Sequence, residues 1–482
     1  MREMKHLSLL TDFYQLTMMN GYLKNNMSDD QVVFDLFFRE NPCHSGFTII
    51  AGIEQVIDYI ENLRFHKEDL EYLQSLDTFD EDFIDALRNF KFKGTIYGVE
   101  EGTVMFPHEP VLRIKGGCFE TQLIETALLN VINHQSLIAT KAARIVTAAK
   151  GAPVFEFGLR RAQGPDAGVY GARASVIGGC SSTSNVLAGK KFGIPVVGTQ
   201  AHSWVQKFSS ELESFRAYAK AYPSNCLLLV DTYNTLESGL PNAITVFNEL
   251  KSQGYEPKGI RIDSGDLAYL SKRARKMLDD AGFPDTVIIA SSDLDEETIA
   301  SLKDQGARID GWGVGTNLIT SKGCPALGGV YKLSAIEEEG TLIPKIKISN
   351  NPEKITNPGY KTVYRIYDKD TGKAQADLIT LADEVIDEEK PLTIFHPVYT
   401  WKQTTYDSYY VKDLLVPIYK EGELVYNRRS IQEIQEKVSK ELKSLWPEYR
   451  RLARPELYKV DLSHALWQLK QDLVEKNKKG LR

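Results

Sequence analysis

Cysteine is scarce and scattered in this sequence. Its 482 residues include only five cysteines, and no two of them have the C-x-x-C spacing of a zinc ribbon or a redox pair. An odd number of distant thiols also argues against a disulfide framework, which a chain of this length does not need in order to bury a core. We therefore expect free thiols, a reducing compartment and hence a cytoplasmic location.

Long apolar runs are missing as well. No stretch of about 18 apolar residues without charge occurs, so the sequence predicts no membrane-spanning helix. The polar start, Met1 to His6, lacks the apolar core and the small-residue cleavage site of a signal peptide. We expect a protein without a membrane partner.

The chain also lacks an excess of positive charge. It has 58 Lys and Arg against 65 Asp and Glu, a net charge of −7, whereas sequence-independent binding of nucleic acid requires a basic face. We expect no nucleic-acid partner. No repeat or low-complexity tract is visible, and a composition of 42% hydrophobic and 26% charged residues is typical of a globular enzyme. The length corresponds to about two to four domains.

The first of three zones, residues 1–135, mixes helices and strands. Leu9–Tyr22 has helical spacing of its apolar residues, and Gln31–Phe38 alternates as a strand does. Phe47–Leu63 predicts a strand that leads into a helix. Val104–Ile114 contains two prolines and therefore predicts short edge strands.

The second zone, residues 136–332, has the rhythm of βα units. Short apolar runs begin about 25 to 45 residues apart and are followed by helical stretches, as buried parallel strands are. We expect a (β/α) barrel or a doubly wound sheet, both of which place functional residues at the carboxyl ends of the strands. The runs are Pro153–Phe157, Ile194–Gly198, Cys226–Val230, Gly259–Ile262, Thr286–Ala290 and Ile309–Val314.

The third zone returns to alternating, strand-like segments. Lys345–Ser349, Thr362–Asp368 and Pro391–Phe395 are its candidate strands, and from Arg428 onward the pattern is charged and helical. We predict that residues 333–400 join residues 1–135 in one domain, because the two segments share β character. Residues 136–332 then form the barrel domain, and residues 401–482 form a C-terminal helical extension.

Polar residues and glycines follow the apolar runs of the second zone. Because strand ends meet at one edge of a parallel sheet, we expect these residues to share one mouth. In chain order they are Arg160 and Arg161, His202, Asp231, Asp263 and Asp266, and the run Gly311–Gly315 with Thr316.

Each of these residues also has a structural explanation when it is taken alone. Asp231 could cap a helix, and Asp263 and Asp266 suit an N-cap and a first-turn acid. Gly311–Gly315 matches neither G-x-G-x-x-G nor a P-loop and could be a tight turn. His202 has no second histidine at metal-ligand spacing, so its alternatives are a structural residue, a general base, a nucleophile or a phosphate contact.

Together the groups indicate more than they do singly. Arginines, the amides of a glycine-rich loop and carboxylates suit a substrate whose phosphates are chelated by Mg²⁺. Tyr14 and Phe157 could stack on a flat ring. No G-x-S-x-G elbow is present, which argues against a serine hydrolase.

Several long segments, in order and over most of the chain, closely resemble the nicotinate phosphoribosyltransferases, a family of type II phosphoribosyltransferases. The segments are Leu10–Thr17 (LTDFYQLT), Phe37–Glu54 (FFRENPCHSGFTIIAGIE), Glu156–Asp166 (EFGLRRAQGPD), Gly178–Gly189 (GGCSSTSNVLAG), Gly198–Ser203 (GTQAHS), Val230–Thr235 (VDTYNT), Gly259–Asp266 (GIRIDSGD) and Gly311–Thr316 (GWGVGT).

The resemblance implies both a fold and a reaction. The fold is α/β, with an irregular (β/α) barrel, a β-rich α+β domain built from N-terminal and later segments, and C-terminal helices. The reaction joins nicotinate to phosphoribosyl pyrophosphate and yields nicotinate mononucleotide and pyrophosphate, in NAD salvage. It uses Mg²⁺, is coupled to ATP hydrolysis through a phosphohistidine as in a ligase, and takes place in a homodimer with shared active sites.

The resemblance also implies roles for single residues. His202 falls on the phosphorylated histidine. Phe157 resembles one face of the pyridine sandwich, and Tyr14 resembles the other, contributed by the neighbouring subunit. Arg160 and Arg261 match contacts to substrate phosphates and the ring.

Two further groups of residues match family motifs. One group comprises acids near the ribose, the Mg²⁺-pyrophosphate and the histidine, and no metal ligand is assigned directly. The other group is the loop for the 5′-phosphate. The acids are Asp231, Asp263 and Asp266, and the loop residues are Gly313, Gly315 and Thr316.

The hydroxyl residues Ser182, Thr183 and Ser184 lie where the related nicotinamide enzyme carries an aspartate. Hydroxyls tolerate a carboxylate, whereas an aspartate repels it and prefers an amide. This difference favours nicotinate as the substrate. The alternatives are the same fold acting on nicotinamide, a barrel phosphohydrolase that depends on Mg²⁺, and an inactive binding protein.

Overall fold

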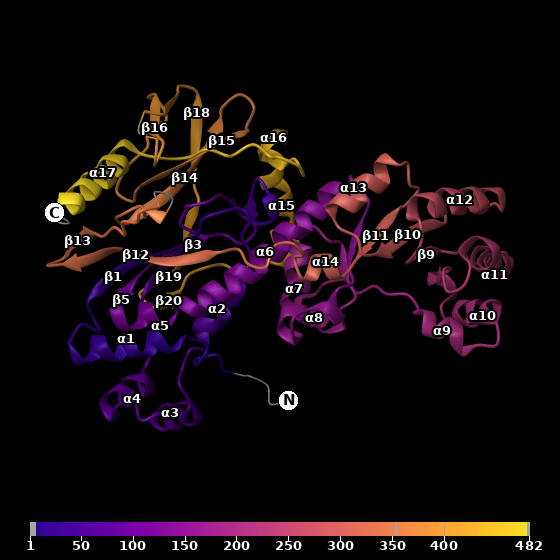
Figure 1. Cartoon of the computed structure of the whole chain (residues 1–482), viewed down its shortest axis with the longest axis horizontal. Helices are drawn as coiled ribbons and strands as arrows, with labels where there is room; N and C mark the ends of the chain where they lie inside the picture. The colour runs from indigo at the N-terminus through magenta and orange to yellow at the C-terminus, as the bar shows by residue number, and fades with distance from the viewer. Residues whose placement is uncertain (1–5, 352–353, 400, 480–482) are drawn as a thin grey trace. The chain divides into compact units, whose positions relative to one another are not determined.

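Strands from the start of the chain pair with strands from its last third, whereas the strands between them pair with one another (Figure 1). The computed structural model describes residues 6–351, 354–399 and 401–479. They divide into two units, unit 1 with residues 1–137 and 326–482 and unit 2 with residues 138–325. Within the described ranges, no helix has the length and apolar character needed to cross a membrane.

The largest sheet of unit 1 has seven strands and is built around β1 (Gln31–Phe38). In Figure 1 the indigo β1 lies against the orange β12 (Gly329–Glu338), with which it pairs antiparallel, and β5 (Leu112–Gly117) pairs with its other edge. The predicted α+β domain built from N-terminal and later segments is therefore confirmed. The remaining strands of this sheet are β3 (Thr95–Val99), β13 (Thr341–Pro344), β19 (Leu415–Lys420) and β20 (Glu423–Leu424).

The prediction of edge strands within Val104–Ile114 is wrong for β5. That strand lies between β1 and β3 in the sheet interior, and only β4 (Val104–Met105) forms a small separate pair with β2 (Thr48–Ile49). Both prolines fall in the connection before β5, which begins at Leu112 and contains no proline. The strand therefore keeps every backbone N–H that a central position needs.

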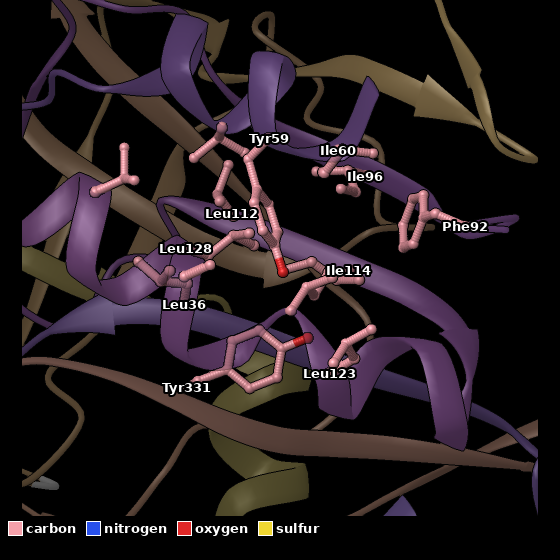
Figure 2. Packing of buried hydrophobic residues seen from close by; sticks show 14 of the residues in the cluster. Leu36, Tyr59, Ile60, Phe92, Ile96, Leu112, Ile114, Leu123, Leu128 and Tyr331 are labelled. Atoms are coloured by element: carbon pink, nitrogen blue, oxygen red, sulfur yellow. The ribbon is translucent and has the colours of Figure 1, made fainter. Parts of the chain in front are cut away.

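Helices cover this sheet and close the main core. Figure 2 shows Tyr59 and Tyr331 among apolar side chains such as Leu112 and Ile114, all of them buried. The Tyr331 hydroxyl donates a hydrogen bond to the Thr121 carbonyl at 2.9 Å, which satisfies its one polar group inside the core. The helices in this part are α1 (Phe13–Lys24), α2 (Ile53–Glu61), α3 (Lys67–Gln74), α4 (Glu81–Arg88), α5 (Cys118–Leu123) and the first half of α6 (Glu125–Ala149).

Residues 401–482 differ from the expected helical extension because they also contribute strands to both large sheets of unit 1. The second sheet has the order β17-β16-β21-β15-β14-β18, so β21, near the end of the chain, lies inside it. Its strands are β14 (Lys361–Asp368), β15 (Ala374–Leu381), β16 (Leu392–Phe395), β17 (Gln403–Tyr406), β18 (Tyr409–Asp413) and β21 (Val460–Leu462). The helices are α15 (Ile431–Ser444), α16 (Pro447–Arg450) and α17 (His464–Lys479).

A buried ion network joins α15 to this sheet. Arg365 in β14 is fully buried and contacts the carboxylates of Asp377 at 2.6 Å and Glu441 at 2.7 Å. Its guanidinium also donates to the Val104 carbonyl at 2.7 Å and lies over the Phe106 ring at 5.4 Å. A buried cation is stable only with such a set of partners, so the helix and the strands are fixed together by one side chain.

Unit 2 contains a parallel sheet in which strands that follow one another along the chain lie side by side, and the last strand, β11, pairs with the first, β6. Among the described residues, the ring of strands is open at one place, between Val196, which pairs with β7, and β8. The arrangement agrees with the predicted irregular (β/α) barrel. Its strands are β6 (Val154–Glu156), β7 (Ser182–Thr183), β8 (Leu227–Leu229), β9 (Gly259–Ile262), β10 (Val287–Ser292) and β11 (Gly311–Val314). Its helices, beside the end of α6, are α7 (Pro165–Ile177), α8 (Val186–Phe192), α9 (His202–Lys207), α10 (Glu211–Ala221), α11 (Leu240–Ser252), α12 (Leu267–Asp280), α13 (Glu296–Asp304) and α14 (Thr316–Ile319).

The strand expected at Ile194–Gly198 is reduced to a single bridge. Val196 faces Thr183 of β7, a short strand that the apolar pattern did not indicate because its residues are hydroxyl-bearing. The Thr183 N–H donates to the Pro195 carbonyl at 3.1 Å, and the Val197 N–H donates to the Thr183 carbonyl at 3.0 Å. Pro195 has no N–H to contribute, so the ladder stops there.

Candidate active site

One face of the parallel sheet gathers the side chains that the sequence singles out. Phe155 is paired with both Ser182 and Gly313, and Gly313 is paired with Ser291. Paired residues project to the same face and neighbours along a strand alternate, so these four positions share a face with Arg261. Phe157, two residues after Phe155, continues this face beyond the end of β6.

Phe157 presents its ring at the end of β6, directly over Gly313. A Cβ atom added at Gly313 would lie 2.6 Å from two carbons of the Phe157 ring and 3.2 Å from the Cβ of Ser291. The ring also stacks on Phe155, with centroids 6.1 Å apart and planes at 20°. Gly313 is therefore required for space rather than for an unusual backbone angle, and it leaves a half-buried aromatic face available.

His202 is the first residue of α9 and lies close to the acid that directly follows β9. Its Nδ1 is 3.1 Å from the Thr232 hydroxyl, and its Nε2 is 4.0 Å from a carboxylate oxygen of Asp263. The side chains of His202 and Asp263 are 40% and 33% exposed, so both remain accessible to a ligand. Thr232 orients the imidazole through one nitrogen and leaves the other toward the acid.

Arg261 and Asp263 form a pair that other polar groups hold in place. The guanidinium donates to the Thr199 hydroxyl at 2.6 Å and to Asp263 Oδ1 at 3.4 Å, and its side chain is 16% exposed. The Ser291 hydroxyl donates to the same Asp263 oxygen. The result is a fixed cation and a fixed anion side by side, next to His202.

Asp231 accepts hydrogen bonds from the loop after β9 and does not cap a helix. Its Oδ2 accepts from the Asp263 N–H at 3.0 Å and from the Ser264 hydroxyl at 2.6 Å. Its Oδ1 is buried and has no hydrogen-bond partner among the described residues. A buried carboxylate oxygen without a partner is costly, which marks Asp231 as a group that a substrate hydroxyl could satisfy.

The helix cap lies at Asp266, which was expected as a first-turn acid, and not at Asp263, which was expected as the N-cap. The Asp266 carboxylate accepts from the Tyr269 N–H at 2.9 Å at the start of α12. Asp263 is tied to Arg261 and Ser291, so the two acids are engaged with different partners. Across the described ranges, no group of three or more His, Cys, Asp or Glu side chains is arranged to hold a metal ion.

The three hydroxyl residues of the loop around β7 differ in what they can contact. The Thr183 side chain is fully buried, donates to the Glu156 carboxylate and accepts from the Asn185 N–H at 3.0 Å. The Ser182 hydroxyl is buried without a partner among the described residues. Ser184 is half-buried and shares the sheet face of Ser182, because side chains alternate along a strand. Ser184 is therefore the hydroxyl best placed to meet a ligand.

The glycine loop passes directly into a short helix. Gly315 precedes α14, whose first residue is Thr316, and both are partly exposed. The Asn317 side-chain amide donates to the carbonyls of Asp293 and Leu294, both at 3.1 Å, and so ties this turn to the loop after β10.

Two predicted residues come from elements other than those that form this cluster. Arg160 is exposed on a short 3₁₀ turn, Leu159–Arg161, after β6. Tyr14 is on α1 in unit 1 and is 51% exposed, as is its neighbour Phe13. The parallel sheet therefore brings together His202, the acids and the Phe157 face but does not include Tyr14.

The structure adds residues to the site that were not among the predicted site residues. Thr199, Thr232 and Ser291 orient Arg261, His202 and Asp263 through their hydroxyls, and Asn317 and Glu156 fix the loops. Thr199, Thr232 and Ser291 each lie within two residues of the end of a predicted apolar run, so position alone could have identified them. Glu156 lies inside such a run, where its charge was the available signal.

Three family models match the chain. They describe the nicotinate phosphoribosyltransferase (NAPRTase) N-terminal domain at residues 9–133, the NAPRTase family at residues 153–377 and the nicotinate phosphoribosyltransferase C-terminal domain at residues 360–470. The nicotinate phosphoribosyltransferase of Bacillus subtilis (strain 168) is 50% identical over 472 residues, which cover 98% of this chain and 96% of that protein. The human protein of that name is 33% identical over 522 residues, and the matched region covers 96% of this chain and 96% of that protein.

Solved structures agree with the sequence matches. The crystal structure of human nicotinic acid phosphoribosyltransferase superposes with a TM-score of 0.86 at 32% identity and covers 96% of this chain and 99% of that one. Nicotinate-nucleotide pyrophosphorylase from Pyrococcus furiosus has a TM-score of 0.70 at 24% identity, over 92% and 97% of the two chains, and shares the fold.

Proposed function

Because the chain belongs to the nicotinate phosphoribosyltransferase family, we propose that it transfers the phosphoribosyl group of phosphoribosyl pyrophosphate to the ring nitrogen of nicotinate. The products are nicotinate mononucleotide and pyrophosphate. The observation that carries the proposal is a group in which Asp263 is hydrogen-bonded to Arg261 and Asp231 and lies 4.0 Å from His202. The chain is also 50% identical to a relative of that name.

Charge separation is the main demand of this reaction. Breaking the bond between ribose and pyrophosphate develops positive charge on the sugar and negative charge on the leaving group. Asp231, with its unpartnered buried oxygen, binds a ribose hydroxyl. Arg261 and Arg160 contact phosphate oxygens. The glycine turn with Thr316 holds the 5′-phosphate through its N–H groups.

We propose that Mg²⁺ enters with the pyrophosphate of the substrate. The partly exposed Asp263 is the carboxylate that suits a hydrated cation which keeps several waters, and Asp266 lies three residues further along the loop. Bound in this way, the ion supplies Lewis-acid stabilisation of the leaving group. This assignment is supported by the donor chemistry of the loop.

The base is held by stacking and by hydroxyl contact. Phe157 provides one aromatic face, and Tyr14 of the neighbouring subunit of a homodimer provides the other. The exposure of Tyr14 and Phe13 on α1 supports a partner contact there. Ser184 meets the nicotinate carboxylate with an uncharged hydroxyl. An aspartate at this place would repel that carboxylate and favour an amide. Orientation of the ring nitrogen then supplies much of the rate.

We propose that ATP drives turnover through phosphorylation of His202, as in an ATP-coupled ligase, and that the enzyme acts in cytoplasmic NAD salvage. The imidazole takes the γ-phosphoryl group, ADP leaves, and water later releases phosphate. The hydrogen bond between Thr232 and one ring nitrogen orients the other nitrogen for this transfer. The added phosphoryl charge would change how the site binds pyrophosphate.

The test is an assay of mononucleotide and pyrophosphate from phosphoribosyl pyrophosphate and Mg²⁺ with nicotinate or nicotinamide, with and without ATP. Product from nicotinate alone, increased by ATP, is expected. Product from nicotinamide instead would refute the hydroxyl argument. Phosphate release without any pyridine would favour a phosphohydrolase, and binding without product would favour an inactive binding protein.

Replacing His202 by Ala tests the coupling. We expect synthesis without ATP to persist and its stimulation by ATP to disappear, together with ³²P incorporation from γ-labelled ATP. The matched control is His134→Ala, since His134 is a half-buried histidine on α6 with no place in the cluster. Full ATP stimulation in His202→Ala would eliminate the phosphohistidine.

A further inference from the structure

Glu156 is a buried carboxyl between the two loops that carry the base-binding groups. It is the last residue of β6, is fully buried, and lies on the sheet face opposite Phe157. One carboxylate oxygen accepts from the Gly158 N–H in its own loop. The other accepts from the hydroxyl of Thr183, the last residue of β7.

Backbone contacts continue this link on both sides. The Ser184 N–H donates to the Glu156 carbonyl at 2.9 Å, and the Phe157 N–H donates to the Val314 carbonyl at 2.8 Å. Thr183, the partner of the Glu156 side chain, also accepts from the N–H of Asn185 at 3.0 Å. Glu156 therefore connects the segment that holds the aromatic ring to the segment that holds Ser184.

We propose that Glu156 is a positioning residue that sets the relation between the Phe157 ring and the Ser184 hydroxyl, and thereby the affinity and selectivity for nicotinate over nicotinamide. The inference rests on the proposed function and goes beyond it, because Glu156 touches neither substrate. It acts through Gly158 and Thr183.

The Gly158 N–H and the Thr183 hydroxyl both donate hydrogen bonds to the Glu156 carboxyl. An ionised carboxylate accepts at both oxygens and therefore matches these two donors. Burial raises the pKa of Glu156 above its usual value, and the bonds from Thr183 and Gly158 offset only part of that rise. A glutamine would place an NH₂ group against one of these donors. The Gly158 N–H cannot turn, so the Thr183 hydroxyl would have to reverse and lose its acceptor.

The test uses Glu156→Gln and Thr183→Val in the full-length enzyme. Each variant disrupts the same bond between the two side chains: Glu156→Gln reverses its direction and removes its charge, and Thr183→Val removes the hydroxyl. For both we expect the KM for nicotinate to rise about tenfold, the loss typical of one charge-assisted hydrogen bond, with a fall in preference over nicotinamide. The KM for phosphoribosyl pyrophosphate stays unchanged, because Arg261 and Asp263 have no contact with Glu156 among their hydrogen bonds.

A double-mutant cycle and a matched control separate positioning from general destabilisation. The double variant should be no worse than the worse single variant, because both disrupt the same bond. The control is Glu296→Gln, which weakens a buried carboxylate paired with Lys141 and Arg144 in the same unit. It should lower the thermal midpoint without changing the KM for either base.

The outcomes of this test are distinct. If wild-type enzyme forms product but both Glu156→Gln and Thr183→Val keep the wild-type nicotinate KM and base preference, the inference is wrong and the proposed function stands. If Glu156→Gln does not fold, Thr183→Val alone decides by the same measurement. A wild-type enzyme that forms no mononucleotide from nicotinate overturns both proposals.

Discussion

The close approach of Phe157 to Gly313 makes Gly313→Ala a demanding test of the site. The added methyl would lie 2.6 Å from two ring carbons, whereas carbon atoms prefer separations of about 3.5 to 4.0 Å. The ring must therefore move by about 1 Å or the strands must separate. Ser291, at 3.2 Å on the other side, limits escape of the methyl group in that direction.

The consequence for catalysis follows from the displaced ring. Overpacking of this kind costs about 1–3 kcal/mol of stability, which a barrel of this size tolerates. A displacement of about 1 Å at a positioning group lowers the rate by up to about 100-fold. We expect kcat/KM for nicotinate to fall by about 10- to 100-fold in Gly313→Ala, while the folded enzyme persists.

Steady-state kinetics with nicotinate, together with urea unfolding, measures both effects. The control is Gly198→Ala, because a Cβ atom there has no atom within 4 Å, and activity close to wild type is expected. The double variant Gly313→Ala/Phe157→Leu should lose less unfolding free energy than the two single variants lose when their losses are added. Its activity should stay low, because the aromatic ring is gone. Wild-type kcat/KM in Gly313→Ala would show that Phe157 does not position the base.

Two further predictions concern unit 1. Replacing Arg365 by Leu leaves the buried carboxylates of Asp377 and Glu441 without their cation, and we expect a loss of about 3–5 kcal/mol in urea unfolding; an unchanged midpoint would contradict the buried network. Burial raises the pKa of Asp461 to about 6, so as pH rises from about 4 to 6 the unfolded state loses this proton first and folding becomes less favourable. Asp461→Asn should therefore stabilise the fold by about 1–2 kcal/mol at pH 7, after a discount for partial exposure, and have no effect near pH 4; equal gains at both pH values would refute this explanation.

Local patterns in the sequence predicted much of the fold. The run Gly259–Ile262 matches β9, and Gln31–Phe38 matches β1, because continuous apolar stretches and strict alternation are properties of single strands. A helix cap in this loop was likewise predicted, but at Asp263; the structure places it at Asp266, whose bond closes within three residues. That distant segments share one domain was predicted from shared β character, whereas the pairing of β1 with β12 was not predicted.

For the candidate site, the sequence determined which chemical groups follow each strand, and His202, Asp231 and Asp263 were predicted in this way. The tertiary structure decided how each group is used. It committed the Thr183 hydroxyl to Glu156, left an oxygen of Asp231 without a partner and placed Phe157 over Gly313. The physical reason is that residue type and strand period are local properties, whereas hydrogen-bond partners and free space depend on neighbouring strands that meet only when the sheet forms.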